Sequence, residues 1–303
     1  MSLADWPALV LAAGLGTRLH PLSSVRAKPA LPVAGTPLVV RILKWLHAAG
    51  VRRTVLNLHH RAESITRIVG DGSALDLEVR YSWEPVLLGS AGGPARAVPL
   101  LGADRFLIVN GDTLADVDLA SLTQQHVDTN ALVTMAVVDG RADYNGVIAD
   151  RNGIVQGFAR HPGAFHFIGI QAVNAAVFAG VDPDAKSETV HGLYPRLMAN
   201  KPEAIRTFQT AAEFFDVGSP SDYLDTALTI AARERQGLDR GRDCDIAAGA
   251  VVSESILWDR VRIGAGARLE RCIAVDDVAV PPGASFSRSS LVMRDNEVVA
   301  TPL

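Results

Sequence analysis

The stretch from residue 8 to residue 33, ALVLAAGLGTRLHPLSSVRAKPALPV, constrains the fold of this chain more than any other. It opens with a short apolar run, Ala8 to Leu11, of the kind that forms a buried strand. Gly14 and Gly16 follow this run. Glycines after a strand let the backbone turn tightly and direct several N–H groups toward one point, where they hold phosphate oxygens. We therefore expect a strand followed by an anion-binding loop.

Two cations, Arg18 and Lys28, follow the glycines. Arginine presents a planar fork of donors, and lysine presents a mobile point charge. Two better-known glycine loops are excluded, because Leu19 stands where a dinucleotide-binding fingerprint needs its third glycine and the chain has no Gly-Lys-Ser/Thr of a P-loop. The pattern predicts a loop that grips a polyphosphate. The alternative is a tight strand-to-helix turn with two surface cations.

Length and composition narrow the class of protein. With 303 residues the chain exceeds one average domain, which favours a large α/β domain with an appendage. Apolar residues make up 48% and charged residues 20%, the balance of a globular protein with an ample core. The net charge of −4 argues against nucleic acid as a partner. No apolar run reaches membrane length, no secretory signal is visible, and Cys244 and Cys272 form neither a metal spacing nor a disulfide framework, so we expect a cytoplasmic protein without a membrane partner.

Strands and helices are expected to alternate after the loop. Thr36 and Pro37 have the residue types of an N-cap and a first helical position, and Gly50 is suited to end that helix. Further strands are expected at 53–58, 77–83, 105–110 and 131–138, and further helices at 62–69 and after 118. Such alternation predicts a mainly parallel sheet with right-handed crossovers. In residues 144–158, YNGVIADRNGIVQGF, two Asn-Gly pairs favour an antiparallel hairpin, so the sheet is expected to become mixed.

Asp112 follows the cleanest central strand, residues 105–110. In open α/β sheets, ligands bind at the carboxyl ends of the strands, where this carboxylate is expected. Mg²⁺ takes one or two carboxylates together with phosphate oxygens and waters, so one aspartate supplies half a site. A turn-forming aspartate is the alternative.

The string GxGxRLxPLS followed by KPALPVAGTPL resembles the signature of sugar-1-phosphate nucleotidylyltransferases, the enzymes that make NDP-sugars. Ala27 stands where that family usually has a proline, and Lys28 is retained. The resemblance implies a Rossmann-like α/β nucleotidyltransferase domain with a mixed, mainly parallel sheet. It also implies Mg²⁺-dependent transfer of a nucleotidyl group from an NTP to a sugar 1-phosphate, which releases pyrophosphate. Arg18 and Lys28 would be the catalytic cations.

The resemblance also implies binding residues along the chain. The segment from Leu88 to Gly93 matches the family's Leu-Gly-Thr-Ala-Gly, which lies against the nucleobase and sugar, although an ordinary strand-to-helix loop is the alternative. The implied nucleotide-binding residues are Leu11, Ala13, Gly14, Gly16, Thr17, Glu84, Gly89 and Ser90. Asp216 precedes Val-Gly-Ser-Pro as the family's second metal ligand does, so Asp112 and Asp216 would share the Mg²⁺.

The sugar-phosphate half departs most from the family pattern. The family's Phe-x-Glu-Lys-Pro appears here as Phe-Ala-Arg-His-Pro at 158–162, and spacing does not decide whether Arg160 or His161 contacts the phosphate. Phe167 replaces a polar residue that many relatives use to hold sugar hydroxyls. The implied sugar-phosphate residues are Asn145, Gly146, Arg160, His161 and Gly169.

The C-terminal segment shows a repeat of six residues. Apolar residues recur at Val251, Leu257, Ile263, Leu269 and Val275, which is typical of a β-helix built from hexapeptides. We expect a nucleotidyltransferase domain at 1–237 and a short left-handed β-helix at 243–303, with fewer than three coils. Such a short stack needs a neighbour, and with no histidine after His191 an acyltransferase is disfavoured. The tail is therefore expected to serve packing and homo-oligomer assembly.

Five functions stay open. The tail resembles mannose-1-phosphate guanylyltransferases, which favours GTP and mannose 1-phosphate. The altered 158–162 segment and Phe167 resemble uridylyltransferases that act on muramic acid phosphate, and a thymidylyltransferase is a further alternative. A catalytically silent nucleotide-sugar-binding subunit, or the same chemistry on a non-sugar phosphate such as phosphocholine, completes the set. Retention of both cations and both aspartates counts against the silent subunit.

Overall fold

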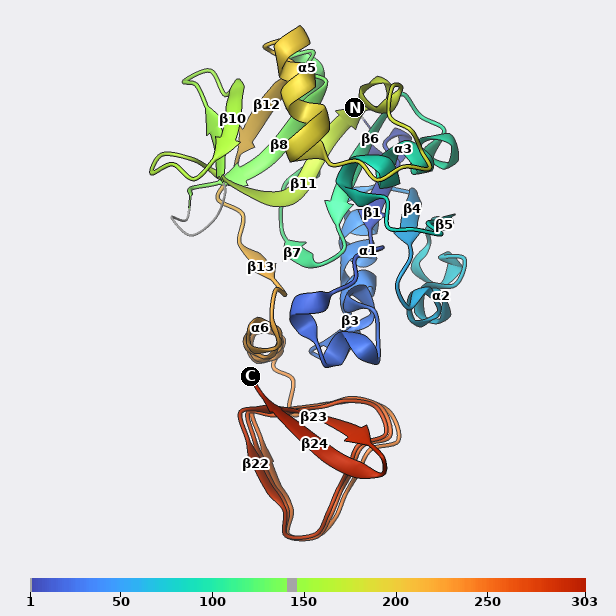
Figure 1. The fold of residues 1–303 in the computed structure, drawn as a ribbon, viewed down its shortest axis with the longest axis vertical. Coiled ribbons are helices and arrows are strands. Elements are labelled where there is room, and N and C mark those ends of the chain that lie inside the picture. The colour runs from blue at the N-terminus through green and yellow to red at the C-terminus, as the bar shows by residue number, and fades with distance from the viewer. Residues whose placement is uncertain (1, 141–145) are drawn as a thin grey trace. The chain divides into compact units, whose positions relative to one another are not determined.

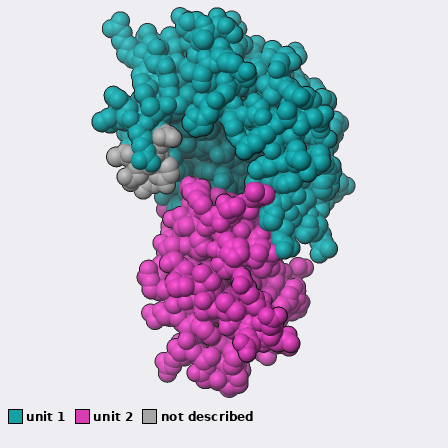
Figure 2. All heavy atoms as spheres, in the orientation of Figure 1, with its two compact units in different colours: residues 1–14, 41–215 teal, residues 15–40, 216–303 magenta. Residues whose placement is uncertain are grey.

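The computed structural model describes residues 2–140 and 146–303 (Figure 1). Contacts between Cα atoms divide the chain into two compact units, each made of two segments (Figure 2). The first unit contains residues 1–14 and 41–215, and the second contains residues 15–40 and 216–303. The part of the loop that bears Arg18 and Lys28 therefore belongs to the same unit as the C-terminal tail. The predicted domain boundary between residues 237 and 243 stays a prediction.

The first unit is built on a seven-stranded sheet with the order β12-β8-β11-β6-β1-β4-β5. Its strands are β1 (Ala8–Leu11), β4 (Arg53–Leu58), β5 (Glu78–Trp83), β6 (Arg105–Asn110), β8 (Val133–Val138), β11 (His166–Asn174) and β12 (Ile205–Gln209). β11 runs antiparallel to both β6 and β8, and every other neighbouring pair is parallel. The predicted mixed, mainly parallel sheet is confirmed, but its antiparallel strand is β11, which was not predicted, and not the hairpin expected from the Asn-Gly pairs, whose strands form a separate sheet.

The core of this unit lies along the central strands. Leu9 of β1, Phe106 and Ile108 of β6, and Val133 and Met135 of β8 are buried in one cluster of apolar side chains. Strands covered on both faces tend to be continuously apolar, which is why the short runs at 8–11 and 105–110 identify their own strands. The apolar sequence therefore fixes where β1 and β6 end, and the candidate site begins at those ends.

The helices are α1 (Leu38–Ala49), α2 (Ala62–Val69), α3 (Gly89–Leu101), α4 (Leu119–Asp128), α5 (Tyr194–Asn200) and α6 (Pro220–Arg233). The predicted start of α1 was wrong. Thr36–Pro37 form a short strand, β3, that pairs with β2 (Pro32–Val33), because Ala34 and Gly35 adopt positive φ angles and turn the chain back. Within the described ranges, no helix has the length and apolar character needed to cross a membrane.

Two small sheets accompany the main one in the topology. β9 (Gly146–Ala149) and β10 (Val155–Ala159) form the antiparallel hairpin that the second Asn-Gly pair predicts, as a separate sheet. At the turn of this hairpin, the Gly153 N–H donates to the backbone oxygen of Asp150 at 3.0 Å. β7 (Thr113–Ala115) and β13 (Phe214–Asp216) form another two-stranded sheet.

The tail of the second unit is a parallel β-helix. Its strands are β14 (Asp239–Arg240), β15 (Asp245–Ile246), β16 (Val251–Ser253), β17 (Ile256–Leu257), β18 (Arg262–Ile263), β19 (Arg268–Glu270), β20 (Ile273–Ala274), β21 (Ala279–Val280), β22 (Ser285–Ser287), β23 (Ser289–Arg294) and β24 (Glu297–Pro302). They form three sheets, one on each side of a triangular coil (Figure 1). β24 runs antiparallel to β23 and ends the stack as a hairpin.

The β-helix does not keep a strict six-residue step. Strand partners lie 17 positions apart, as between Ile256 and Ile273, so one of the three steps in each coil has five residues. A fixed six-residue step placed Val251 among the inward residues, but its side chain is 48% exposed and its neighbour Val252 stacks beside Leu269. The predicted register was therefore wrong at Val251. The sheet that contains β14, β17, β20 and β23 extends from Asp239 to Ser290. The tail therefore has three coils, and the prediction of fewer than three was wrong.

A buried histidine in α4 gives the first prediction. His126 Nδ1 lies 2.9 Å from Thr134 Oγ1, and Nε2 lies 2.8 Å from Asn174 Oδ1. Burial lowers the pKa of His126 despite the hydrogen bond to Asn174. Below the ordinary pKa of a histidine, the unfolded chain therefore binds more protons than the folded chain, and stability falls as pH drops through about 6.5.

We expect the melting temperature to decline from pH 7.5 to pH 5.5, and H126Q to flatten that decline although it lowers the melting temperature at pH 7.5. Thermal unfolding across a pH series measures both. H191Q, at an exposed histidine, is the control and should keep the wild-type slope. An unchanged slope in H126Q would contradict the assignment.

Candidate functional site

The second unit brings together three charged residues that the sequence supplies from separate motifs. Lys28 is almost buried, and its Nζ lies 3.9 Å from Asp216 Oδ1. A Cβ placed on Gly218 would lie 3.3 Å from Arg18 Nη1 and 3.4 Å from Asp216 Oδ2. The Arg18 guanidinium and the Asp216 carboxylate therefore lie beside Gly218, and the Lys28 ammonium lies beside the same carboxylate.

The loop conformation brings Gly16 and Lys28 close together. Gly16 has a φ of +62°, in the left-handed region, and starts a 3-10 turn at Thr17–Leu19. A Cβ on Gly16 would lie 3.6 Å from Lys28 Cβ, so the two ends of the loop are packed against one another. A second 3-10 turn, Lys28–Ala30, fixes the lysine backbone. In a partly dry site, cations attract phosphate oxygens more strongly than in bulk water.

The other predicted loop residues differ in exposure. Gly14 and Thr17 are exposed, and a Cβ on Gly14 would meet nothing within 4 Å. Ala13 is buried, and Leu11 ends β1 half-buried. Open space at Gly14 fits a backbone that a ligand approaches, and the nucleotide-binding roles of these residues stay predictions.

In the first unit, Asn57 links the start of the loop to Glu84. Asn57 Oδ1 accepts a hydrogen bond from the Ala12 N–H at 2.7 Å, and its Nδ2 donates to Glu84 Oε1 at 2.7 Å. Glu84 Oε2 accepts from the Leu88 N–H at 2.9 Å. Both oxygens of the buried Glu84 carboxylate are thus held by the protein. Glu84 therefore joins the loop that begins at Ala12, through Asn57, to the loop at Leu88. Its predicted contact with a nucleotide stays a prediction.

The glycines at 89–93 are required by packing inside the protein. A Cβ on Gly89 would lie 2.6 Å from the backbone oxygen of Ser187, and one on Gly92 would lie 2.7 Å from the backbone oxygen of Ala185. A Cβ on Gly93 would lie 2.7 Å from Glu84 Oε1. These contacts give a structural reason for the glycines, where the sequence interpretation offered approach to a planar base.

Ser90 also has internal partners. Its hydroxyl donates to Glu188 Oε2 at 2.7 Å and accepts from the Thr189 N–H at 2.9 Å. Ser90 therefore ties the N-terminal turn of α3 to residues 188–189. Its predicted contact with a nucleotide stays a prediction.

Asp112 lies beyond the carboxyl end of β6, where the sequence predicts it. Gly111 crosses directly over the end of β1, since its N–H donates to the Leu11 oxygen at 2.9 Å. The Thr113 hydroxyl donates to Asp112 Oδ1 at 3.3 Å. Gly169, with a φ of +78°, faces the Asn110 side chain, which a Cβ would approach to 2.7 Å. Asp112 and Gly169 thus flank the same strand end.

The predicted sugar-phosphate residues are only partly placed. Asn145 lies outside the described residues. Gly146 begins β9, where a Cβ would lie 2.4 Å from Ala164 Cβ. Arg160 and His161 are exposed after β10, and His161 Nδ1 accepts from the Gly163 N–H at 3.1 Å. The choice between these two cations stays open.

The donor chemistry fits a hard divalent ion. Asp112 and Asp216 are both partly exposed carboxylates. Asp112 directly precedes β7, Asp216 is the last residue of β13, and these two strands pair in one sheet. No group of three or more histidine, cysteine, aspartate or glutamate side chains gathers within residues 2–140 and 146–303. Mg²⁺ does not need such a cage, because it completes its shell with waters and phosphate oxygens.

Several supporting residues were not predicted. Asn57 gave a signal, because it is a polar residue inside the apolar strand RTVLNL. Glu188 gave none, since its partner Ser90 is 98 residues away in sequence.

Comparison with known proteins agrees with this fold. A model of the nucleotidyl transferase family matches residues 7–233, and a model of the GlmU-like C-terminal hexapeptide matches residues 240–289. The chain therefore belongs to the nucleotidyl transferase family and is an enzyme of that class, which confirms the resemblance seen in its loop. The hexapeptide match likewise confirms the β-helix tail.

Individual relatives define the closer likeness. A mannose-1-phosphate guanylyltransferase from Mycobacterium tuberculosis is 29% identical over 298 residues, which cover 93% of this chain and 83% of that protein. An N-acetylmuramate alpha-1-phosphate uridylyltransferase from Neisseria meningitidis is 45% identical over 118 residues, 39% of this chain and 51% of that protein. The crystal structure of HddC from Yersinia pseudotuberculosis has a TM-score of 0.66 at 24% identity and covers 74% of this chain and 99% of that one. This last likeness shows the fold alone.

Proposed function

We propose that this enzyme transfers a nucleotidyl group from an NTP to a sugar 1-phosphate and releases pyrophosphate. The observation that carries the proposal is that the Asp216 carboxylate lies 3.9 Å from Lys28 Nζ and, with Arg18, beside Gly218. Two cations beside a carboxylate suit two polyanionic substrates, and the curated relatives are sugar-1-phosphate nucleotidylyltransferases.

The chemistry requires positioning rather than a protein nucleophile. An oxygen of the sugar phosphate attacks the α-phosphorus, a new P–O bond forms, and the bond to the β-phosphate breaks so that pyrophosphate leaves. Arg18 would draw charge onto the leaving pyrophosphate, and Lys28 would orient the phosphates. Backbone N–H groups at Gly14 and Gly16 would hold the triphosphate. Holding two anions in line, with charge stabilised as it develops, supplies most of the rate.

Asp112 and Asp216 are the residues that would hold Mg²⁺. When bound, the ion neutralises phosphate charge that the two cations leave uncompensated. The pairing of β7, which follows Asp112, with β13, which ends at Asp216, supports the assignment. The carboxylate oxygens of both side chains support it as well.

The first choice of substrates is GTP and mannose 1-phosphate. The guanylyltransferase relative extends over 93% of the chain, so its likeness includes the tail. The alternative is UTP and N-acetylmuramate 1-phosphate, favoured by the higher identity over 118 residues and by Phe167 in place of a polar residue. The Phe167 side chain packs against the apolar core, and it has no hydroxyl or amide to offer to a sugar.

A panel of four NTPs against several sugar 1-phosphates, measured by pyrophosphate release, tests the proposal. We expect GTP with mannose 1-phosphate to give the highest kcat/KM. A maximum with UTP and N-acetylmuramate 1-phosphate would establish the alternative. Absence of pyrophosphate release with every pair would refute the proposed activity and favour a nucleotide-sugar-binding subunit.

We also propose that the tail forms a homo-oligomer, supported by its match to hexapeptide repeats. Light scattering during size-exclusion chromatography measures this directly. A monomer at micromolar concentration would refute it.

A further inference from the structure

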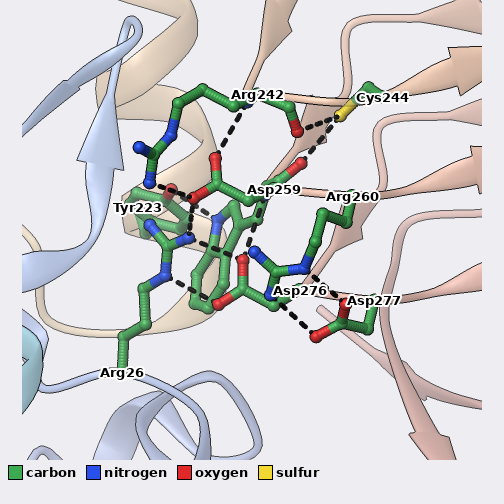
Figure 3. Close-up of polar contacts among 9 residues, drawn as sticks. Arg26, Tyr223, Arg242, Cys244, Asp259, Arg260, Asp276 and Asp277 are labelled. Atoms are coloured by element: carbon green, nitrogen blue, oxygen red, sulfur yellow. Dashed lines mark hydrogen bonds and ion pairs between the residues drawn. The ribbon is translucent and has the colours of Figure 1, made fainter.

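The loop that carries Arg18 and Lys28 is tied to the tail through Arg26, which lies two residues before Lys28. Arg26 Nε donates to Asp276 Oδ2 at 2.8 Å, and Nη2 donates to Asp276 Oδ1 at 2.6 Å (Figure 3). The same Nη2 lies 2.8 Å from Asp259 Oδ2. The three side chains are only 13–15% exposed. A bidentate arginine–carboxylate pair fixes direction as well as distance.

The face of the Arg26 guanidinium is also occupied. Its Cζ lies 5.1 Å from the centroid of the Trp258 ring, within the range of a cation–π contact. Trp258 Nε1 donates to the Tyr223 hydroxyl at 3.1 Å, and that hydroxyl donates to the Pro32 oxygen. The loop is therefore held a second time, four residues after Lys28. A third link joins the Gly35 N–H to Asp239 Oδ1 at 2.9 Å.

The acceptors of Arg26 are fixed by the β-helix itself. Asp259 Oδ1 accepts from the Arg242 N–H at 2.9 Å, and Asp276 Oδ1 accepts from the Asp259 N–H at 3.0 Å. Asp259 and Asp276 thus occupy equivalent places on successive coils, 17 residues apart. Burial would raise the pKa of Asp259, but the Arg242 amide and the Arg26 charge hold that pKa below its usual range, so Asp259 stays ionised at neutral pH.

We propose that Arg26 is a positioning residue for nucleotidyl transfer, and that through it the tail fixes the loop bearing Arg18 and Lys28. The inference rests on the proposed function. It gives the tail a direct part in catalysis beyond packing and assembly. Removing one partner of a buried, paired charge frees the loop, and a displacement of about 1 Å in a positioning group lowers rates by about 100-fold.

The kinetic test compares R26M with a matched control in the same coils. Arg260 makes an equally bidentate pair with Asp277, at 2.6 Å and 2.8 Å, but both of these side chains are more than half exposed, unlike Arg26 and its partners. We expect R26M to lower kcat about 10- to 100-fold with KM for the NTP changed less than about threefold, because the loss falls on transition-state positioning. R260M should stay within about twofold of wild type.

A milder variant keeps the test valid if R26M folds poorly. D276N retains Asp259 as a charged partner of Arg26, so we expect a smaller loss of kcat. The double variant R26M/D276N should be no slower than R26M within about twofold, since both substitutions break one interaction. Additive losses would overturn the proposal.

Hydrogen–deuterium exchange supplies a readout that needs no turnover. In the wild type, the amides of Leu19, Val25 and Leu31 are hydrogen-bonded within the loop. We expect these amides to exchange faster in R26M and at the wild-type rate in R260M. Wild-type kcat or wild-type loop exchange in R26M would overturn the inference. An inactive wild type would refute the proposed function alone, and the exchange result would still decide whether Arg26 fixes the loop.

Discussion

Replacing Asp112 with asparagine is expected to lower kcat for pyrophosphate release by about 1,000-fold, equivalent to about 4 kcal/mol of lost transition-state stabilisation. The substitution keeps the shape of the side chain, and the Thr113 hydroxyl still has an acceptor. It removes the negative charge that a divalent ion requires. Because Asp112 is partly exposed at the end of β6, the melting temperature should change little.

The control for this variant is D116N, which removes an exposed carboxylate only four residues further along the chain. We expect its kcat to stay within about twofold of wild type. D216N should lose as much activity as D112N, and the double variant should lose no more than either single one, since groups that act as a unit are not additive. Near-normal turnover in D112N across a magnesium titration would refute the metal assignment.

Replacing Lys28 with methionine is expected to lower kcat by about 100- to 1,000-fold. Methionine preserves most of the apolar stem of this nearly buried side chain and removes its charge. Asp216, 3.9 Å away, loses a cationic neighbour, so a small loss of stability is also expected. Arginine should restore only part of the rate, because its planar fork does not reproduce a compact point charge.

K44M is the matched control for K28M, because Lys44 is an exposed lysine of α1. We expect K44M to leave kcat and KM unchanged. Steady-state kinetics with saturating magnesium measure both variants, and thermal unfolding reports whether each is folded. Equal rates for K28M and K44M would contradict a catalytic role for Lys28.

Local sequence signals identify five of the seven strands of the main sheet, but β11 and β12 were not predicted. β1, β4 and β6 begin and end at the predicted residues, since each is a short apolar run that the core must bury on both faces. The start of α1 was wrong because proline suits both a first helical position and a short strand. Only the positive φ angles at Ala34 and Gly35 decide for the strand.

The β-helix shows the limit of a periodic pattern. A six-residue step identifies the architecture, but it accumulates an error of one residue in each coil of 17. This error moved Val251 to an inward position that Val252 occupies. A repeat with one short step in three cannot be read with a single period.

The candidate site was predictable where its residues stand in motifs. Arg18 and Lys28 lie near Asp216, although Asp216 is far from the loop in sequence, and their catalytic and metal-binding roles stay predictions. Arg26 carries no such signal, because its partners Asp259 and Asp276 are 233 and 250 residues away. Likewise, the packing of Gly89 and Gly92 against residues 185–188 depends on a fold that a local motif does not describe.

The most direct test is a crystal structure of the enzyme with Mn²⁺ and a non-hydrolysable NTP, with anomalous scattering recorded at the manganese edge. Manganese shares the oxygen-ligand preference of magnesium and is visible by this signal. We predict one anomalous peak coordinated by a carboxylate oxygen of Asp112, a carboxylate oxygen of Asp216 and a phosphate oxygen, with Arg18 and Lys28 on the triphosphate. A bound nucleotide whose manganese contacts neither aspartate would contradict the account.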